Sequence, residues 1–386
     1  MGSEDGNMTG DWNVGVVTTP SSESSYMEPT YRFVDVLSHS SGAIIILAGD
    51  QINAEAPESS SKFVDIGNGE YFGIAPMDYI LLQILISIKL VGLRSELDLV
   101  YFHKGAMGLA LPILVARLSG VTVCIIKVGA FAKDRISSDS ISILHRLLYA
   151  LQYLSFQVAH SAVVFSQSEI ESVPNSRVFV AYSNYRDFDQ FDINTPMSER
   201  PVEIGFVGRF SGVKGITKMA RAAVSLVKSN GNLTVRLVGD GPEYEYVESL
   251  VAEYDSITLT GWVNHDEIAA EYNQMQVMIA PSKGEGLPTG FIEAMGCGTV
   301  ILATPVGSIG DLITDGKTGF HLPNRKPETI VREVNNIRDR SDLKKIGKNA
   351  RNHVVSTYSK EAAERRFAKI TKSLMLSQSG LEFGNK

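Results

Sequence analysis

Continuous apolar runs of strand length alternate with helical stretches along this chain. The run Ala43-Ile-Ile-Ile-Leu-Ala48 has no polar side, which is typical of a parallel strand covered on both faces. Strand-like runs return at 97–103, 121–126 and 162–166, with helical patterns between them. This alternation predicts an α/β protein built on doubly wound parallel sheets.

The chain has 386 residues, which is too long for one ordinary hydrophobic core, so we expect two domains. Two prolines, Pro196 and Pro201, mark the stretch between them. The predicted organisation is a flexible tail (1–12), a first Rossmann-like domain (13–194), a hinge (195–201), a second Rossmann-like domain (202–358) and a C-terminal helical segment (359–386).

Charge and cysteine content narrow the class of protein. Residues 1–194 hold 12 Lys and Arg against 21 Asp and Glu, a net charge of −9, and residues 195–386 hold 24 against 22, or +2. No basic stripe indicates nucleic-acid binding, and a mildly basic second half suits an anionic ligand there. Cys124 and Cys297 lie far apart in apolar contexts, which favours reduced thiols in a cytoplasmic protein. The polar, acidic start lacks the pattern of a secretory leader.

The most apolar stretch is Tyr79–Leu93, which Gln83 and Lys89 interrupt. A membrane-spanning helix needs roughly 20 apolar residues, so this stretch is too short to span. We expect a buried helix. A helix lying in the membrane interface is the alternative, which a thin polar face and an acidic first half disfavour.

The stretch 277–298 carries the strongest functional signal. The apolar run Val277–Ala280 leads through a glycine-bearing loop to a helix expected to start at Pro288. Such a loop binds anions, because the first-turn amides of a helix lack partners and its dipole favours negative charge. Two carboxylates, Glu285 and Glu293, bracket this loop, and ionised Glu accepts hydrogen bonds from sugar hydroxyls. A nucleotide sugar would supply both groups. The alternative is that Glu285 caps the helix and Glu293 lies on its solvated side.

The same stretch resembles a known enzyme family. Pro281-Ser282, Glu285-Gly286 and Glu293-Ala-Met-Gly-Cys-Gly298 are similar to the signature of the retaining glycosyltransferases of family 4, in which two glutamates are separated by seven residues. The segments 300–311 and 315–320 continue that pattern. The resemblance is strong from about 202 to 325 and weaker elsewhere.

The resemblance implies a GT-B fold, with two Rossmann-like domains that face a cleft, and a final helix that crosses back to the first domain. It implies retaining transfer of a sugar from a nucleoside-diphosphate sugar, with UDP or GDP as the expected nucleotide, to an acceptor hydroxyl. Glu293 would bind the donor ribose and Glu285 the donor sugar. The remaining donor contacts would come from Gly208, Gly239, Gly241, Trp262, Val263, Gly286, Leu287, Pro288 and Thr289. For the glycines an ordinary strand-to-helix turn is the alternative, and for Trp262 a place in the core.

Arg209 and Lys214 form a second constellation, in the family pattern Gly-Arg-Phe-x-x-x-Lys-Gly. The resemblance assigns both to the donor diphosphate, where two cations would neutralise charge growing on the leaving phosphate. Two solvated surface cations are the alternative. No spacing of His, Cys or acidic residues predicts a metal site or a further cofactor.

The acceptor side is less defined. Family members often place a His near the transferred sugar; here the commoner position holds Lys127-Val-Gly129, and His103 lies one strand earlier. His103 or Lys127 could contact substrate, and a structural histidine is the alternative. The loop 20–26 lacks the glycines usual in the family.

A glycan or a lipid-linked molecule is the expected acceptor, in polysaccharide, glycolipid or glycoprotein assembly. Peripheral contact with the inner face of the cell membrane is the alternative to a location in the cytoplasm alone. The rival functions are a sugar-nucleotide epimerase or phosphorylase on the same fold, and a non-catalytic partner subunit that binds sugar nucleotides.

Overall fold

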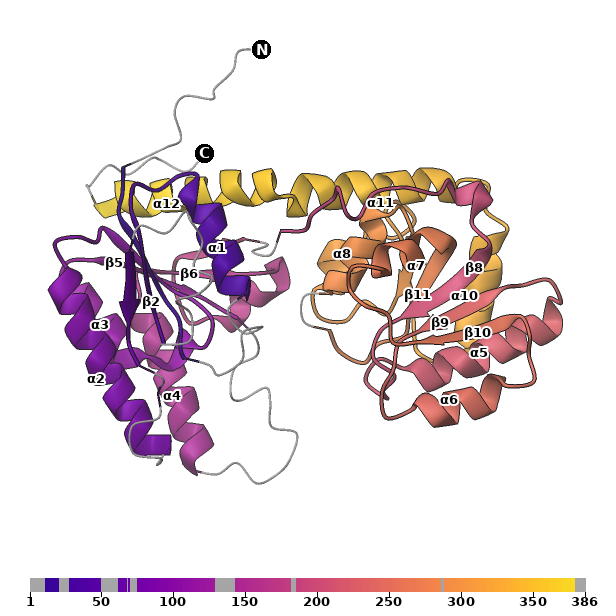
Figure 1. The fold of residues 1–386 in the computed structure, drawn as a ribbon, viewed down its shortest axis with the longest axis horizontal. Helices are drawn as coiled ribbons and strands as arrows, with labels where there is room; N and C mark the ends of the chain where they lie inside the picture. The colour runs from indigo at the N-terminus through magenta and orange to yellow at the C-terminus, as the bar shows by residue number, and fades with distance from the viewer. Residues whose placement is uncertain are drawn as a thin grey trace, which may run out of the picture. The chain divides into compact units, whose positions relative to one another are not determined.

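The computed structural model describes residues 11–20, 28–49, 62–67, 69, 75–128, 143–181, 185–285 and 288–378. The chain forms two compact units, residues 1–185 with 360–386 and residues 186–359. Each unit contains one parallel sheet with helices packed on it, as Figure 1 shows. The predicted α/β class is therefore confirmed.

The first unit is built on seven parallel strands in the order β3-β2-β1-β4-β5-β6-β7. Their bounds are β1 Val14–Val17, β2 Ile44–Ala48, β3 Lys62–Asp65, β4 Leu99–Phe102, β5 Thr122–Ile126, β6 Ser161–Val164 and β7 Val178–Val180. The central strands β1, β2, β4, β5 and β6 are buried along their whole length, which explains their continuous apolar runs.

Helices cover both faces of this sheet. The helices α2 (Ala75–Leu93), α3 (Ala110–Leu118) and α4 (Ile143–Val158) share one hydrophobic core with the sheet. The helices α1 (Glu28–Ser38) and α12 (Lys360–Gln378) share a second core with its other face and lie side by side in Figure 1. Helices on both faces of one parallel sheet make this arrangement doubly wound.

The helix α12 belongs to the first unit although 174 residues of the second unit precede it, since the second unit spans 186–359. Its side chains Phe367, Ile370 and Leu374 are buried in the core beside α1. The hydroxyls of Tyr101 and Thr371 lie 2.8 Å apart within this core. Buried hydroxyls need such a partner, so the pair fixes the position of α12 on the sheet.

The helix α2 is not buried, so the expectation for Tyr79–Leu93 is wrong for its outer side. The side chains of Ile80 and Ile88 are 58% and 61% exposed, while the polar residue Gln83 is buried. Gln83 faces inward because its Oε1 accepts a hydrogen bond from the backbone N–H of Leu111 at 3.1 Å. Among the described residues, no helix has the length and apolar content that a membrane span requires.

The second unit repeats the design with six parallel strands in the order β10-β9-β8-β11-β12-β13. The strands are β8 Val202–Val207, β9 Val235–Val238, β10 Ile257–Gly261, β11 Met275–Ala280, β12 Val300–Ala303 and β13 Phe320–His321. The helices are α5 Ile216–Ser229, α6 Tyr244–Val251, α7 Ile268–Gln274, α8 Thr289–Gly296, α9 Ile309–Leu312, α10 Pro327–Arg338 and α11 Leu343–Tyr358.

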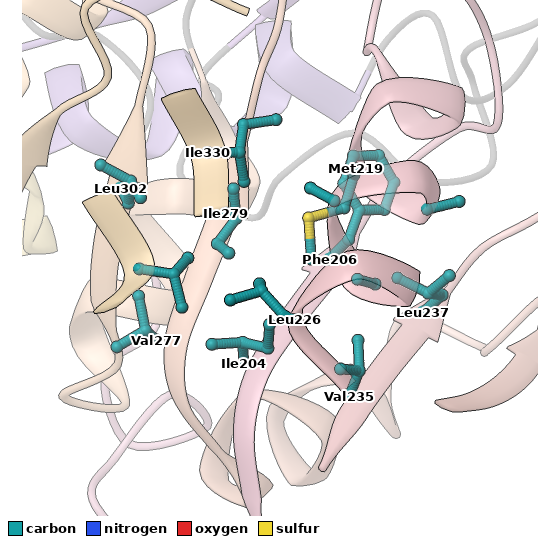
Figure 2. Close-up of a cluster of buried hydrophobic side chains, with 14 of the residues drawn as sticks. Ile204, Phe206, Met219, Leu226, Val235, Leu237, Val277, Ile279, Leu302 and Ile330 are labelled. Atoms are coloured by element: carbon teal, nitrogen blue, oxygen red, sulfur yellow. The ribbon is translucent and has the colours of Figure 1, made fainter. Parts of the chain in front are cut away.

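The core of the second unit forms where α5 packs on the central strands. Alternate residues of β8, β9 and β11 point to the same side, as the twofold period of a strand requires. Figure 2 shows Phe206 of β8 beside Met219 of α5, and Ile204 of β8 beside Leu226 of the same helix. Burial of these side chains anchors the strand ends from which the candidate site is built.

The second unit begins earlier in the chain than predicted. Residues 186–194, which the sequence pattern assigned to the first domain, belong to the second unit. Asp192 forms an ion pair with Arg351 at 2.8 Å. The side-chain amide of Asn273 donates a hydrogen bond to Asp192 O and accepts one from the N–H of Asn194. These polar contacts, together with the buried ring of Phe191, attach the segment to the second unit.

Candidate functional site

The strand order of the second sheet determines where its loops meet. The strands β8 and β11 are neighbours at the centre, where the order reverses. In open α/β sheets, ligands bind beyond the carboxyl ends of the two strands at this switch point. The loop 208–215 follows β8, and the loop 281–288 follows β11. Arg209, Lys214 and Glu285 all lie in these two loops.

Glycines let the loops approach each other closely. A Cβ atom on Gly239, which has φ +136°, would lie 1.9 Å from the carbonyl oxygen of Gly208. A Cβ on Gly215, with φ +76°, would lie 2.3 Å from the carbonyl oxygen of Pro281. Both positions require glycine because a side chain would clash with backbone. The expected glycine turn at Gly239 and Gly241 is therefore a point of backbone contact between the loops after β8 and β9.

Hydrogen bonds join the loops after β8 and β11. The N–H of Lys283 donates to the carbonyl oxygen of Val213 at 2.7 Å. The guanidinium of Arg325 donates to Pro281 O at 2.7 Å and to Gly212 O at 2.8 Å. One side chain thus bonds the backbone of both loops, which holds their side chains in a defined relative position.

Lys214 and Glu285 form an ion pair across these loops. The Nζ of Lys214 lies 2.7 and 2.8 Å from the two carboxylate oxygens of Glu285. The hydroxyl of Ser282 donates to the same carboxylate at 2.6 Å. The side chain of Glu285 is 7% exposed and that of Lys214 is 35% exposed. The carboxylate is therefore held firmly, while the ammonium still reaches solvent.

Arg209 is exposed, and no hydrogen bond or ion pair joins it to another part of the chain that the structure describes. Its place directly after Gly208, beyond the end of β8, makes it available to an anionic ligand at the switch point.

Glu293 lies on α8 and is not on a solvated helix side. Its side chain is 7% exposed, and its Oε1 lies 3.0 Å from Nε of Arg186 and 3.4 Å from Nε2 of His265. The charge of this carboxylate contributes to raising the pKa of the nearby Tyr272 hydroxyl, which burial already raises well above its ordinary value. The solvated-side alternative for Glu293 is thus wrong.

Trp262 is 76% exposed, so its alternative place in the core is also wrong. It follows β10, with Val263 half-buried beside it. A large apolar ring at the surface beside this edge of the sheet is available to stack on a flat ligand.

The start of α8 is only partly within the described residues. Gly286 and Leu287 lie outside them. The helix begins at Thr289, with Pro288 one position before it and not at its first position as expected. The carbonyl oxygen of Pro288 accepts hydrogen bonds from the N–H groups of Phe291 and Ile292. The first N–H groups of the helix have no acceptor within it, as at any helix N-terminus.

The predicted acceptor-side residues lie in the first unit. His103 follows β4 and is 2% exposed; its Nδ1 lies 3.0 Å from the Thr30 hydroxyl, and its ring stacks on Phe33. Burial lowers the pKa of His103 to about 3, so the ring is neutral. Lys127 is 5% exposed and forms an ion pair with Glu169 at 2.7 Å. These surroundings favour the structural alternative for His103. Gly129 lies outside the described residues.

Sequence reasoning missed Arg186, His265 and Arg325. Arg186 lies 107 positions before Glu293, and no local spacing connects them. Within the described residues, no group of three or more His, Cys, Asp or Glu side chains is arranged to hold a metal ion. Both cysteines are buried and free, and burial raises the pKa of each thiol to about 12.

Comparison with known proteins finds that the sequence of the second unit is similar to glycosyltransferases. Residues 187–353 match the family model of glycosyl transferases group 1. An uncharacterised glycosyltransferase of Methanocaldococcus jannaschii is 29% identical over 179 residues, which are 45% of this chain and 46% of the relative. The alpha-D-kanosaminyltransferase of Streptomyces kanamyceticus is 27% identical over 184 residues, 47% of each chain. The matched region spans about half the length of these two relatives.

Solved structures resemble the chain over nearly its whole length. A structure of Anabaena HepE in complex with UDP has a TM-score of 0.71 at 15% identity and covers 93% of this chain and 99% of the other. Sucrose-phosphate synthase of Thermosynechococcus elongatus has a TM-score of 0.66 at 16% identity, covering 95% and 100%. The expected GT-B fold is therefore confirmed.

Proposed function

Because residues 187–353 match the family model of glycosyl transferases group 1, we propose that this protein is a retaining glycosyltransferase. It moves a sugar from a nucleoside-diphosphate sugar to the hydroxyl of a glycan or lipid-linked acceptor. The observation that carries the proposal is the ion pair between Lys214 and Glu285 at the switch point of the second sheet. The ammonium of Lys214, which would bind phosphate, lies 2.7 Å from the carboxylate of Glu285, which would bind sugar hydroxyls.

The bond that breaks in this reaction joins the sugar to the diphosphate. Lys214 and Arg209 would bind the phosphate side, and Glu285 would bind the hydroxyls of the sugar. The bond would then lie beside the Lys214–Glu285 pair. Negative charge grows on the leaving phosphate and positive charge on the sugar ring as the bond breaks, so each charged group stabilises the charge opposite to its own.

The rest of the donor would extend away from this pair. Glu293 accepts hydrogen bonds from the ribose hydroxyls, and Trp262 stacks on the base. The leaving phosphate takes the proton of the acceptor hydroxyl, so no protein side chain needs to act as a strong base. The UDP bound to Anabaena HepE makes UDP-sugars the first donors to test.

The test is a screen of UDP-, GDP- and ADP-glucose by thermal shift, followed by transfer to acceptors from cell extracts. A donor at 100 times its dissociation constant should stabilise the protein by roughly 2.7 kcal/mol. NMR of the product should show the same anomeric configuration as the donor. Absence of any shift with all three donors, in protein with a cooperative melt, would contradict the proposal.

Replacement of Lys214 by Ala should lower kcat by about a hundredfold and change donor affinity much less. The reason is that the charge on the leaving phosphate is greatest in the transition state. Steady-state kinetics with the preferred donor would measure both. The matched control is Lys228→Ala, an exposed cation at the far end of α5, which should behave as wild type. An unchanged kcat with a raised KM would make Lys214 a uniform binding group.

Activity should persist in EDTA, since Arg209 and Lys214 place two cations where a divalent ion would otherwise neutralise the diphosphate. The measurement is kcat with chelator in about fivefold excess over total divalent ion, followed by addition of magnesium or manganese. Loss of turnover that either metal restores would contradict the metal-independent mechanism.

A further inference from the structure

The helix α2 is apolar on its exposed side as well as on its buried side, unlike an ordinary surface helix. Its exposed side chains include Met77, Ile80, Ile84, Ile88 and Val91, each between 40% and 61% exposed. Their spacing of three or four residues puts them on one side of the helix. The polar side chains Asp78, Gln83 and Ser87 are buried, facing the protein. Water therefore meets the exposed apolar side chains, which costs free energy unless something covers them.

The neighbouring helices extend this apolar surface. The helix α3 packs against both α2 and α4 on the same face of the sheet (Figure 1). On α3 the exposed apolar side chains are Leu111, Leu114 and Leu118, the last 78% exposed. On α4 they are Leu147, Tyr153 and Leu154. We call the outer side of these three helices the apolar face.

The exposed charges on the three helices of the apolar face have one sign. The exposed charged residues among the described side chains of α2, α3 and α4 are Lys89, Arg117 and Arg146. Asp78 is the one acidic residue there, and it is buried. The first 194 residues carry a net charge of −9, so the lack of exposed acids on this layer is a local departure from the composition.

We propose that the apolar face docks on an anionic lipid surface. The aliphatic side chains would enter the boundary between headgroups and acyl chains, and the three cations would contact lipid phosphates. Tyr153 suits the same boundary because its ring is apolar and its hydroxyl is polar. The long stems of Lys89 and Arg146 let their charges reach the headgroups while the stems lie among apolar groups.

The charge argues against a second copy of this chain as the occupant. In a twofold dimer the same surface meets itself, so three cations on one copy would face three on the other. A membrane of anionic lipid attracts the same three charges. The proposal concerns the first unit alone and does not depend on the donor site, which lies in the second unit.

The experiment is flotation of the full chain with vesicles of phosphatidylcholine and phosphatidylglycerol in equal parts, and with vesicles of phosphatidylcholine alone. We expect binding to the anionic vesicles that weakens as salt rises, because headgroup attraction is screened. Ile80→Asp and Ile88→Asp should each lower partitioning by about tenfold or more. Lys89→Ala should lower it by about fivefold. Tyr246→Asp, at an exposed aromatic residue of α6 in the second unit, is the matched control and should not change it.

Circular dichroism and a cooperative thermal melt would show that each variant is folded. If the aspartate variants misfold, Lys89→Glu tests the same surface at an exposed charge. Failure of the wild-type chain to float with anionic vesicles would overturn the proposal. So would a dimer, seen by sedimentation velocity, that Ile88→Asp dissociates, because the occupant would then be a second copy. Equal flotation of Ile88→Asp and wild type would place any lipid contact elsewhere.

Discussion

Replacing Glu285 by Gln is expected to lower kcat by about a hundredfold or more, with the donor dissociation constant nearly unchanged. The amide keeps the shape of the side chain and an oxygen that accepts hydrogen bonds, but it loses the negative charge. That charge matters most when the sugar ring becomes positive, which happens only in the transition state. Turnover at saturating donor, together with calorimetric titration of the donor, would separate the two quantities.

The geometry around Glu285 suggests its controls. Ser282→Ala removes one hydrogen bond to the same carboxylate, worth about 1.5–3 kcal/mol, but leaves its charge in place, so it should lower kcat much less than Glu285→Gln. Glu328→Gln, at an exposed position of α10, should leave both quantities at wild-type values. If Glu285→Gln also had wild-type turnover, the carboxylate would be a structural partner of Lys214 and the transferase proposal would lose its main support.

Replacing Glu293 by Gln should have two effects. The first is weaker donor binding, by about 1.5–3 kcal/mol, because a charged hydrogen bond to the ribose is lost. The second is lower stability, by about 3–5 kcal/mol, since Arg186 is 12% exposed and would keep its charge without the carboxylate beside it. Turnover at saturating donor should stay near wild type, because the ribose does not react.

A double-mutant cycle separates these effects. Arg186→Met combined with Glu293→Gln should recover much of the stability lost in Glu293→Gln, while donor binding stays weak. Glu203→Gln is the control, because the pair between Glu203 and Arg338 is about one-quarter exposed on both sides and should be worth roughly 1 kcal/mol or less. Full recovery of donor affinity in the double variant would show that Glu293 acts through the fold and not through the ribose.

The sequence predicted local features of the fold well where a pattern was regular. The strand-like runs expected at 97–103, 121–126 and 162–166 overlap β4, β5 and β6, which are buried along their whole length. The helix α10 was missed, although Pro327 at its start and Ile330, Val334 and Ile337 on one side carry the helical signal. The edge strand β3 was also missed, since it has four residues and no fully buried position.

The pairing of charges in the candidate site could not be predicted in the same way. The spacing of Glu285 and Glu293 is local, so the motif identified both. Their partners Lys214 and Arg186 lie 71 and 107 positions away and reach them through strand order and loop packing. The exposed side of α2 was misjudged for a related reason: the helix is mostly apolar all round, and the contact of Gln83 with the backbone of Leu111 helps to decide which side faces inward.

The position of α12 has a consequence for the order in which the chain can fold. The second unit is continuous in sequence, so its core can form as soon as residues 186–359 are available. The first unit is not continuous, because Phe367, Ile370 and Leu374 complete the core beside α1. During synthesis, part of one face of the first sheet therefore stays uncovered, with its apolar side chains exposed, until α12 has been made. The unit whose synthesis begins first can complete its core only after the whole second unit has been synthesised.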